Sequence, residues 1–444
     1  GRAPLYVSPT NSEWSVVCIY SRTFVGTCIT LRIVPVAQTE SVQSIVSKEW
    51  LHLLVFIHAR AKMSASSCMS DEGGEHEGIW MAFRASPQIW GKKRVAEVQA
   101  DLLKIALTIA KYEPVFMIVS PEDHPRLSSM LQGQEAKPTH KIHVMKHLLD
   151  DLWIRDSGAI FTVRGETEGE DSQTPAEASP LRAVKFNFNG WGKKQAHSRD
   201  ATVADVMARS LGVPLVPSRL VLEGGGIEVD GEGTAIITQS CVLNANRNPK
   251  LSKESAETEL KKLLGLEKII WLPGIAGEDI TDGHTDFYAR FASPGNVVAS
   301  LDDDPSSFDK KVTESHLKIL EKETDAKGRR LNVTVLPVPS RTRRTSEYFA
   351  AGYVNFLVLN GAVLVPEFGD PKADGHARDQ LSRLFPGRVV EQLNIDAIAD
   401  GGGGIHCATM QQPKVKGVSC VPAESLNSGP TSVKVTESVG GNAS

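Results

Sequence analysis

Apolar residues recur every three or four positions in five separate stretches of the chain, which predicts five amphipathic helices. These stretches are bounded by Gly, Pro or Ser and span residues 94–112, 199–211, 252–264, 306–326 and 374–385. Short runs rich in β-branched and aromatic residues lie between them, as is typical of strands. The alternation predicts an α/β fold, although no internal repeat is visible in the sequence.

Composition narrows the class of protein. The 444 residues are 41% hydrophobic and 23% charged, with a net charge of -4, so the chain can bury a large core. Neither a nucleic-acid partner nor a membrane partner is expected. The six cysteines show no CxxC pair, which indicates reduced thiols without a disulfide framework or a zinc site, and no metal or organic cofactor is expected.

The most informative motif is GGGGIHC, residues 401–407, followed by Gln411, Gln412 and Pro413. Glycines let another group approach the backbone closely, so Cys407 can be presented bare at the wall of a site as a nucleophile. The alternatives are a small buried cysteine and a plain flexible loop. Other segments of the chain favour the nucleophile.

A proton partner for this thiol lies in DGHTDFYARF, residues 282–291. The pattern of aromatic and apolar residues predicts a strand, on which His284 and Asp286 would project to the same face. An acid/base group and a carboxylate would then lie side by side. A solvated strand end is the alternative interpretation.

Two further segments place carboxylates beside glycine or aromatic residues. Arg155 and Asp156 follow Trp153 and precede an apolar strand, and Glu223 precedes three glycines. The Asp230-Gly231 pair predicts a hairpin turn just after this second segment. An ordinary ion pair between Arg155 and Asp156, and a turn capped by Glu223, are the structural alternatives.

Several carboxylates around one thiol suit a planar cation with many N–H donors better than a neutral peptide bond. We therefore expect the substrate to be a guanidine. Two carboxylates that each accept a pair of N–H bonds would fix its central carbon in front of the sulfur.

The motifs WIRDSG, LEGGG, GHTD, NFLVLNGAVLVPEFGD and GGGGIHC with QQP, in this order, resemble the agmatine deiminase and bacterial-type peptidylarginine deiminase family of the guanidino-group-modifying superfamily. The segment EGIWMAFRASPQIW, residues 77–90, is similar to that family's opening strand and loop. The resemblance runs from about residue 75 to about residue 413. It implies a five-bladed α/β propeller, or pentein, of pseudo-fivefold ββαβ repeats around a central active-site channel, and it is compatible with a homodimer.

The resemblance also implies a role for each candidate residue. Cys407 would be the nucleophile and His284 the general acid/base, while Asp156 and Asp286 would hold the guanidinium nitrogens. Glu223 would orient His284 or help to hold the substrate. The reaction would pass through a thiouronium on Cys407 and release a ureido product, without a cofactor.

Trp153 and Gly404 are expected to line the substrate site. The family commonly has Pro after the glycine of its first motif, Asn at the position of Gly404 and an aliphatic residue at that of Thr285. Here Ala159 follows that glycine. These departures bear on loop geometry and hence on which guanidine fits.

Agmatine, free arginine and peptidylarginine all remain open as substrates. Agmatine would need acids or aromatic faces for its far amine, whereas arginine or its peptides would need cationic or backbone donors. The Arg-rich segment 340–348 is a candidate carboxylate-binding loop, with a solvated loop as the alternative. The lack of an evident secretion signal favours a cytoplasmic polyamine enzyme that converts agmatine to N-carbamoylputrescine and ammonia.

Domain boundaries follow from the extent of the resemblance. Residues 75–415 are predicted to form the catalytic domain, and residues 1–70 a disordered or non-native extension, with Met63 as the natural start. The acidic segment 164–180 is predicted to be a mobile surface loop, and residues 416–444 a disordered tail.

Two other classes of function stay open at this point. An amidinotransferase or another cysteine hydrolase would use the same thiol and histidine. A non-catalytic guanidine-binding protein would keep the carboxylates and dispense with chemistry.

Overall fold

The computed structural model describes residues 4–7, 16–19, 31–32, 67–135, 137–165, 179–416 and 420–422. The chain divides into two units, residues 1–61 and 62–444. In the first unit, strands β1 (Pro4–Val7), β2 (Val16–Ile19) and β3 (Leu31–Arg32) pair antiparallel in that order.

Three predictions fall largely outside the described residues. They are the extension at residues 1–70, the mobile loop at residues 164–180 and the tail at residues 416–444. Within the tail, the described residue Cys420 is buried, and its carbonyl accepts a hydrogen bond from Gln412 Nε2 at 2.7 Å. The three predictions stay predictions.

The strands of the second unit form five sheets within the part of residues 67–422 that the structure describes. Each sheet contains an antiparallel pair of strands and, after a helix, a further strand that runs parallel to one of the pair. In sheet order the strands are β10 (Leu215–Pro217), β9 (Leu181–Lys185), β8 (Ile160–Arg164) and β4 (Ser67–Cys68); β11 (Ile227–Val229), β12 (Thr234–Thr238) and β13 (Lys268–Leu272); β14 (Ala289–Ser293), β15 (Asn296–Leu301) and β16 (Asn332–Pro337); β17 (Leu357–Leu359), β18 (Ala362–Pro366) and β19 (Val389–Leu393); and β20 (Thr409–Pro413), β5 (His76–Phe83), β6 (Val115–Val119) and β7 (Ile142–Lys146).

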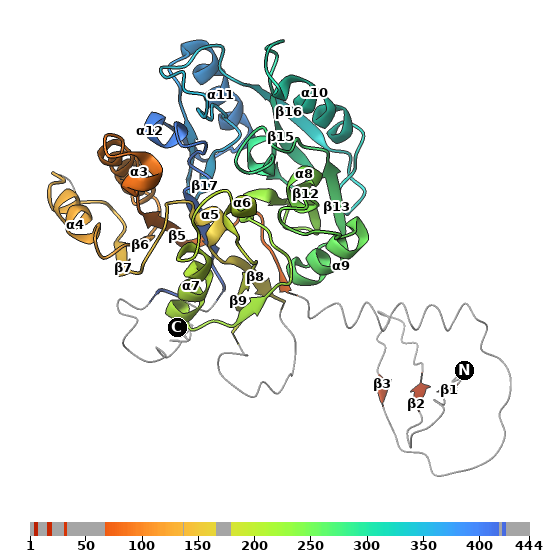
Figure 1. The fold of residues 1–444 in the computed structure, drawn as a ribbon. Coiled ribbons are helices and arrows are strands. Elements are labelled where there is room, and N and C mark those ends of the chain that lie inside the picture. Colours follow the sequence, from red (N-terminus) through yellow and green to blue (C-terminus); the bar gives the residue numbers. More distant parts are fainter. Residues whose placement is uncertain are drawn as a thin grey trace, which may run out of the picture. The chain divides into compact units, whose positions relative to one another are not determined.

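All five predicted helices are present, at the outer side of the view in Figure 1. They are α3 (Val95–Ile109), α7 (Val203–Leu211), α9 (Lys253–Leu264), α10 (Asp309–Leu320) and α11 (Pro371–Leu384). The other helices of the described residues are α2 (Pro87–Trp90), α4 (His124–Gln132), α5 (Ile154–Ser157), α6 (Gly190–Lys193), α8 (Gln239–Val242) and α12 (Asp396–Ala399). Short 3-10 turns lie at Asp200–Thr202, Gly224–Gly226 and Thr285–Phe287. Capping residues explain where α9 begins and ends. Ser252 accepts from the Ser255 N–H at the start of α9, and Gly265 takes a left-handed conformation at its end.

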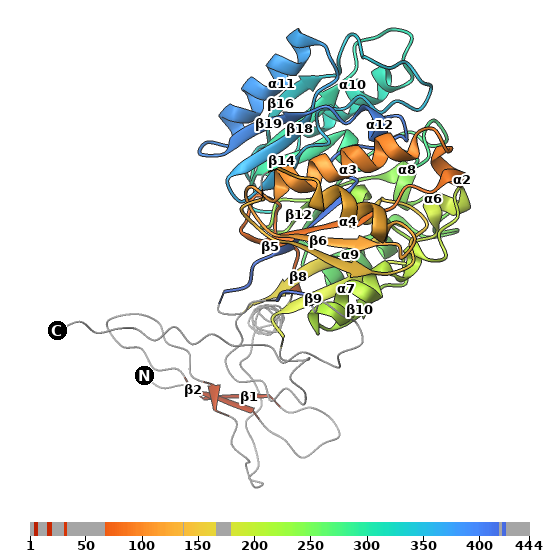
Figure 2. The same cartoon turned by 90° about the vertical axis from the view of Figure 1, so that its left-hand side faces the viewer.

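The strands that lie in the middle of their sheets are buried on both faces. The residues of β6, β12 and β18 are all buried, which explains why these segments read as apolar runs such as VFMIV. Helices cover these sheets, and Figure 2 shows α3 and α4 beside β5 and β6. Among the described residues, no helix is long and apolar enough to span a bilayer.

The last strand closes the second unit by pairing with the first long one. β20 runs antiparallel to β5, with Thr409 opposite Met81 and Gln412 opposite Gly78. The Trp80 indole donates to Gln412 Oε1 at 2.9 Å within this pair. The pairing holds the segment after Cys407 in fixed register against the start of the unit.

Gly78 offers a test of this closure. A Cβ at Gly78 would lie 2.7 Å from both the Phe116 ring and the Pro114 carbonyl oxygen, so Gly78→Ala should destabilise the fold by about 1–3 kcal/mol. Gly375→Ala in α11 is the matched control, because its nearest contact would be Arg378 at 3.9 Å, and it should gain up to about 1 kcal/mol. Denaturant unfolding measures both, and equal stability of the two variants would contradict this account.

Candidate active site

The predicted acid/base residues converge on one point in the structure. A Cβ built on Gly225 would lie 2.6 Å from His284 Nδ1, 2.9 Å from Asp156 Oδ1 and 3.2 Å from Asp286 Oδ2. Three segments far apart in the sequence therefore bring one ring nitrogen and two carboxylates together. Only a residue without a side chain fits between them.

Cys407 lies immediately before β20 and is 5% exposed. Asn355 Nδ2 donates to its sulfur at 3.2 Å, and Asn355 Oδ1 accepts from the backbone N–H of His406 at 3.0 Å. Asp286 Oδ2 is 3.6 Å from the same sulfur. The nucleophile predicted from sequence thus lies against one of the predicted guanidinium-binding carboxylates.

The glycine run before Cys407 packs tightly against side chains. A Cβ on Gly401 would meet the Trp90 ring at 2.1 Å, one on Gly403 the Trp153 ring at 2.3 Å, and one on Gly404 the Asn355 amide oxygen at 2.3 Å. Close approach, and not flexibility, explains these glycines. Trp153 and Gly404, which sequence predicted to line the substrate site, build the wall beside Cys407.

The prediction of a strand over residues 282–291 is wrong for residues 282–288. Asp282 and Gly283 have φ values of 61° and 86°, residues 285–287 form a 3-10 turn, and β14 begins only at Ala289. Side-chain hydrogen bonds hold this turn, since Thr281 Oγ1 accepts from the His284 N–H and Thr285 Oγ1 donates to the Gly226 carbonyl. His284 and Asp286 still approach the same point, but through a turn.

His284 is almost fully buried between two carboxylates. Its Nε2 lies 3.3 Å from Glu223 Oε2, and its Nδ1 lies 3.7 Å from Asp156 Oδ1. Burial alone would lower the pKa of this imidazole, but Asp156, Cys241 and Glu223 raise that pKa well above its ordinary value. In this environment His284 is suited to act as an acid that donates a proton.

Glu223 is fully buried and does not cap the 3-10 turn that follows it, which removes the turn-cap alternative. Both of its oxygens lie 2.9 Å from Arg247 Nε. Burial raises the pKa of Glu223, but the hydrogen bond with His284 and the charge of Arg247 bring it below its ordinary value. The geometry therefore favours orientation of His284 over direct contact with a substrate.

Asp156 lies in the single turn of α5 and points away from its neighbour Arg155. Its Oδ2 accepts from the Trp191 indole at 2.9 Å, and its Oδ1 accepts from the Gly225 N–H at 3.0 Å. Trp191 has a φ of 55°, a strained value for a bulky residue, in the loop that closes over this carboxylate. Burial, with Asp286 and Glu223 nearby, raises the pKa of Asp156.

Arg155 does not form the ordinary ion pair with Asp156 that was the structural alternative. Its Nη2 lies 3.2 Å from Glu72 Oε2 and its Nη1 donates to Gln411 Oε1 at 2.7 Å. Asp156 is therefore free of a cationic neighbour in its own turn. The hairpin predicted at Asp230-Gly231 is confirmed between β11 and β12.

Two buried atoms of the site have no hydrogen-bond partner within the described part of the chain, namely His284 Nδ1 and Asp286 Oδ1. Buried polar atoms are almost always paired, so unpaired ones at a convergence point indicate a missing ligand. Asp286 Oδ1 can accept a hydrogen bond from an N–H of a guanidinium, and His284 Nδ1 can give a proton to the nitrogen that leaves.

Among the described residues, Glu223, Cys241 and His284 form a group whose ligand atoms lie within 4.8 Å of one another. Its oxygen, sulfur and nitrogen atoms are ligand types that zinc accepts. Arg247, however, already occupies both oxygens of Glu223. This arrangement suits orientation of a histidine better than metal binding.

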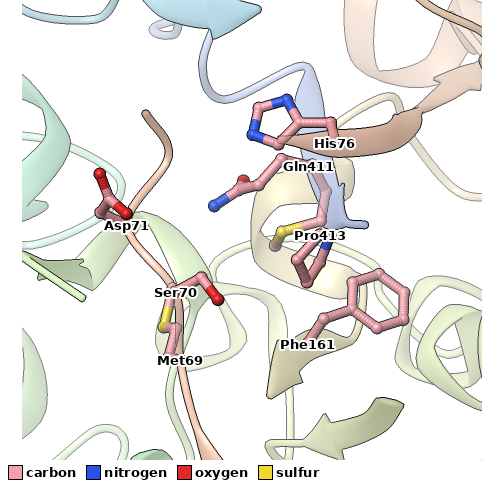
Figure 3. A pocket seen from close by; sticks show the side chains of 8 residues that line it. Met69, Ser70, Asp71, His76, Phe161, Gln411 and Pro413 are labelled. Atoms are coloured by element: carbon pink, nitrogen blue, oxygen red, sulfur yellow. The ribbon is translucent and has the colours of Figure 1, made fainter. Parts of the chain in front are cut away.

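Figure 3 shows a small cavity that is lined by other residues. His76 and Gln411 lie on one side of it, and Ser70 and Asp71 lie on the other. None of the predicted catalytic side chains lines it. The candidate site is therefore the convergence around Gly225 and Cys407.

Comparison with known proteins identifies the family of the chain. Residues 68–413 match the Porphyromonas-type peptidyl-arginine deiminase family. The chain belongs to this family. The matched segment contains every residue predicted for the site.

Relatives in this family include the agmatine deiminases of Stutzerimonas stutzeri and Pseudomonas aeruginosa (strain LESB58). Each is 35% identical over 369 residues, which cover 78% of this chain and 95% of the relative. The solved agmatine deiminase of Enterococcus faecalis superposes with a TM-score of 0.69 at 30% identity, covering 79% of this chain and 96% of that one. The mixed α/β fold with several sheets is thus shared with deiminases of this family.

Sequence reasoning missed several residues that surround the site. Asn355, His406, Trp191 and Arg247 each contact a predicted site residue, and Glu72 contacts His406, yet none was given a role in catalysis. Asn355 and His406 lie inside quoted motifs, so adjacency to Cys407 was the available signal for His406. Glu72 lies 334 residues from its partner His406, and no local pattern indicates it.

The convergence on Gly225 gives a sharp test. Gly225→Ala should reduce deiminase activity at least about 100-fold, because its methyl group would displace His284 and the carboxylates from their positions. Gly226→Ala is the matched control, since its Cβ would meet Cys241 at 3.4 Å, Leu222 at 3.5 Å and His284 at 3.9 Å, all ordinary contact distances, and it should stay within about threefold of wild type. Steady-state ammonia release measures both variants. Comparable losses in the two would refute the convergence.

Proposed function

We propose that the protein is an agmatine deiminase that hydrolyses agmatine to N-carbamoylputrescine and ammonia through a thiouronium on Cys407. The observation that carries the proposal is a buried thiol beside Asp286, at a point where Asp156, His284 Nδ1 and Asp286 Oδ2 meet. Asp286 Oδ1 has no hydrogen-bond partner among the described residues, so these buried anions can accept further N–H bonds from a cation. A guanidinium supplies both the charge and the donors.

The thiol depends on that cation to ionise. Burial, with the anions Asp286 and Asp156, raises the pKa of Cys407 well above its ordinary value. A guanidinium held by the same two carboxylates reverses their effect, because a positive charge beside sulfur lowers the pKa of a thiol. The substrate thus activates its own nucleophile.

The reaction then proceeds in two halves. The Cys407 thiolate attacks the guanidinium carbon, a C–S bond forms, and the C–N bond to one terminal nitrogen breaks as His284 gives that nitrogen a proton and ammonia leaves. Water then attacks the same carbon and gives a proton to His284. The C–S bond breaks, the thiolate returns and the ureido product leaves.

Substrate choice rests on charges near the site. The candidate carboxylate-binding loop holds an exposed Arg341 as well as Arg343 and Arg344, and the last two are already paired within the protein. Arg343 Nε lies 2.7 Å from Asp396, and Arg344 lies 2.7 Å from both Asp400 and Glu97. These arginines are therefore not available for a substrate carboxylate, which favours agmatine over free arginine.

Burial of the site also favours a small substrate. Cys407, His284 and Asp286 are 5%, 1% and 0% exposed, so a peptide-wide groove does not reach them. A neighbouring loop packs against the site: the Trp191 indole donates to Asp156 Oδ2 at 2.9 Å, and Lys194 Nζ lies 2.9 Å from Asp282. A peptidylarginine deiminase would need this loop to open around a whole chain.

The five sheets support a further part of the proposal, namely that they form the five blades of a propeller around the site. Each contains the same ββαβ arrangement, and the last is completed by the C-terminal strand β20. The proposed homodimer rests on the family resemblance alone, and the cytoplasmic location stays a prediction.

Turnover of three guanidines by the full chain tests this proposal. Agmatine should give ammonia and a ureido product in equal amounts, at a kcat/KM at least about 100-fold above free arginine and a blocked arginine peptide, because Arg343 and Arg344 are occupied. Cys407→Ala should lose all turnover, and Cys420→Ala, which removes a buried cysteine that the mechanism does not use, should retain it.

Other outcomes assign other functions. Release of ammonia only from the peptide would indicate a protein-modifying deiminase. Transfer of the amidino group to an added amine, without release of ammonia, would indicate an amidinotransferase. Binding of agmatine without any turnover in the wild-type chain would indicate a guanidine-binding protein.

A further inference from the structure

His406, the residue before Cys407, is held between two carboxylates. Its Nδ1 lies 2.8 Å from Asp286 Oδ2 and its Nε2 lies 2.9 Å from Glu72 Oε2. The side chain is 1% exposed, so water does not compete for either nitrogen. The proposed mechanism gives this second histidine no part in proton transfer.

Both flanking carboxylates are ionised. Glu72 lies 2.9 Å from Arg290 Nη2 and 3.2 Å from Arg155 Nη2, and its Oε1 accepts from the Val358 N–H at 2.8 Å. Burial raises the pKa of Glu72, but Arg290, His406 and Arg155 bring it well below its ordinary value. The pKa of Asp286 is lowered in the same sense by its hydrogen bond with His406, against the effect of burial.

Because an ionised carboxylate can only accept hydrogen bonds, each ring nitrogen of His406 must carry a proton. We infer that His406 carries a proton on each ring nitrogen, donates to Asp286 and Glu72, and so positions Asp286 for the guanidinium. Asp286, and not His406, touches the substrate. His406 is thus a positioning residue, distinct from the acid/base His284.

Positioning explains why one oxygen of Asp286 is unpaired. His406 fixes Oδ2, so the carboxylate cannot rotate, and Oδ1 is left buried with no partner among the described residues. Arg155 Nε also donates to the His406 carbonyl at 3.3 Å and so ties the backbone before Cys407 to the same network. The imidazolium also places a positive charge one residue from the thiol.

Nitrogen NMR of the full-length wild-type chain tests the protonation state directly. With ¹⁵N-labelled histidine at pH 7.5, His406 should show two N–H groups, and its signals are assigned by their loss in His406→Gln. A ring with one N–H and one bare nitrogen would overturn the inference. This measurement needs neither activity nor a stable variant.

Two variants with the same chemical change separate positioning from bulk charge. Glu72→Gln removes the anion that faces His406 and should leave His406 with a single N–H. Glu228→Gln is the matched control, because Glu228 contacts Arg290 but forms no hydrogen bond with His406 in the described structure. In this variant His406 should keep both N–H groups. Burial raises the pKa of Glu228, so this site tolerates a neutral side chain.

A kinetic arm rests on the proposed agmatine deiminase reaction. His406→Gln and Glu72→Gln should raise KM for agmatine at least about tenfold and slow alkylation of Cys407 by iodoacetamide at pH 7.5, while Glu228→Gln stays within about threefold. Wild-type kinetics in both His406→Gln and Glu72→Gln would overturn the inference. Absence of turnover in the wild type would instead reject the proposed function and leave the NMR result to decide.

Discussion

The structure depends on one electrostatic constraint, the burial of several carboxylates around a single thiol. Asp156, Asp286 and Glu223 are each 6% exposed or less, and an unpaired buried anion is costly. Arg247 and His284 compensate Glu223, and His406 compensates Asp286. Asp156 has only the distant His284, and Asp286 keeps one oxygen unpaired, so the site is complete only when a cation enters. Affinity for a guanidinium and activation of Cys407 then have the same physical origin.

The fold meets this constraint by bringing loops from separate sheets to one point. Asp156 precedes β8, Glu223 and Gly225 precede β11, His284 and Asp286 precede β14, Asn355 precedes β17 and Cys407 precedes β20. Each site residue therefore lies before the first strand of an antiparallel pair, and the repeated ββαβ arrangement places equivalent loops together. Glycines make the approach possible, since a methyl group on Gly225, Gly401 or Gly403 would overlap a neighbouring side chain. Tight packing, and not chain flexibility, presents the thiol.

Sequence predicted what local patterns encode. Helical periodicity located five long helices but missed α4, which is as long as α7. The motifs around Cys407, His284, Asp156, Asp286 and Glu223 located residues that do converge or contact one another. The strand over residues 282–288 failed because the positive φ of Asp282 and Gly283, together with side-chain bonds from Thr281 and Thr285, overrides the apparent alternation. Neither the role of Glu72 nor the direction of the Arg155 side chain, away from Asp156, could be predicted. Their partners lie at least 83 residues away, and only the folded chain brings them together.

The central claim is that Cys407 captures the guanidinium carbon within this negative site. The most direct measurement is acid quenching of the wild-type chain during agmatine turnover, followed by intact and peptide mass spectrometry. The account predicts a mass increase equal to agmatine minus ammonia, located on the peptide that contains Cys407. Continued product formation with no such increase on Cys407, or with the increase on another residue, would contradict it.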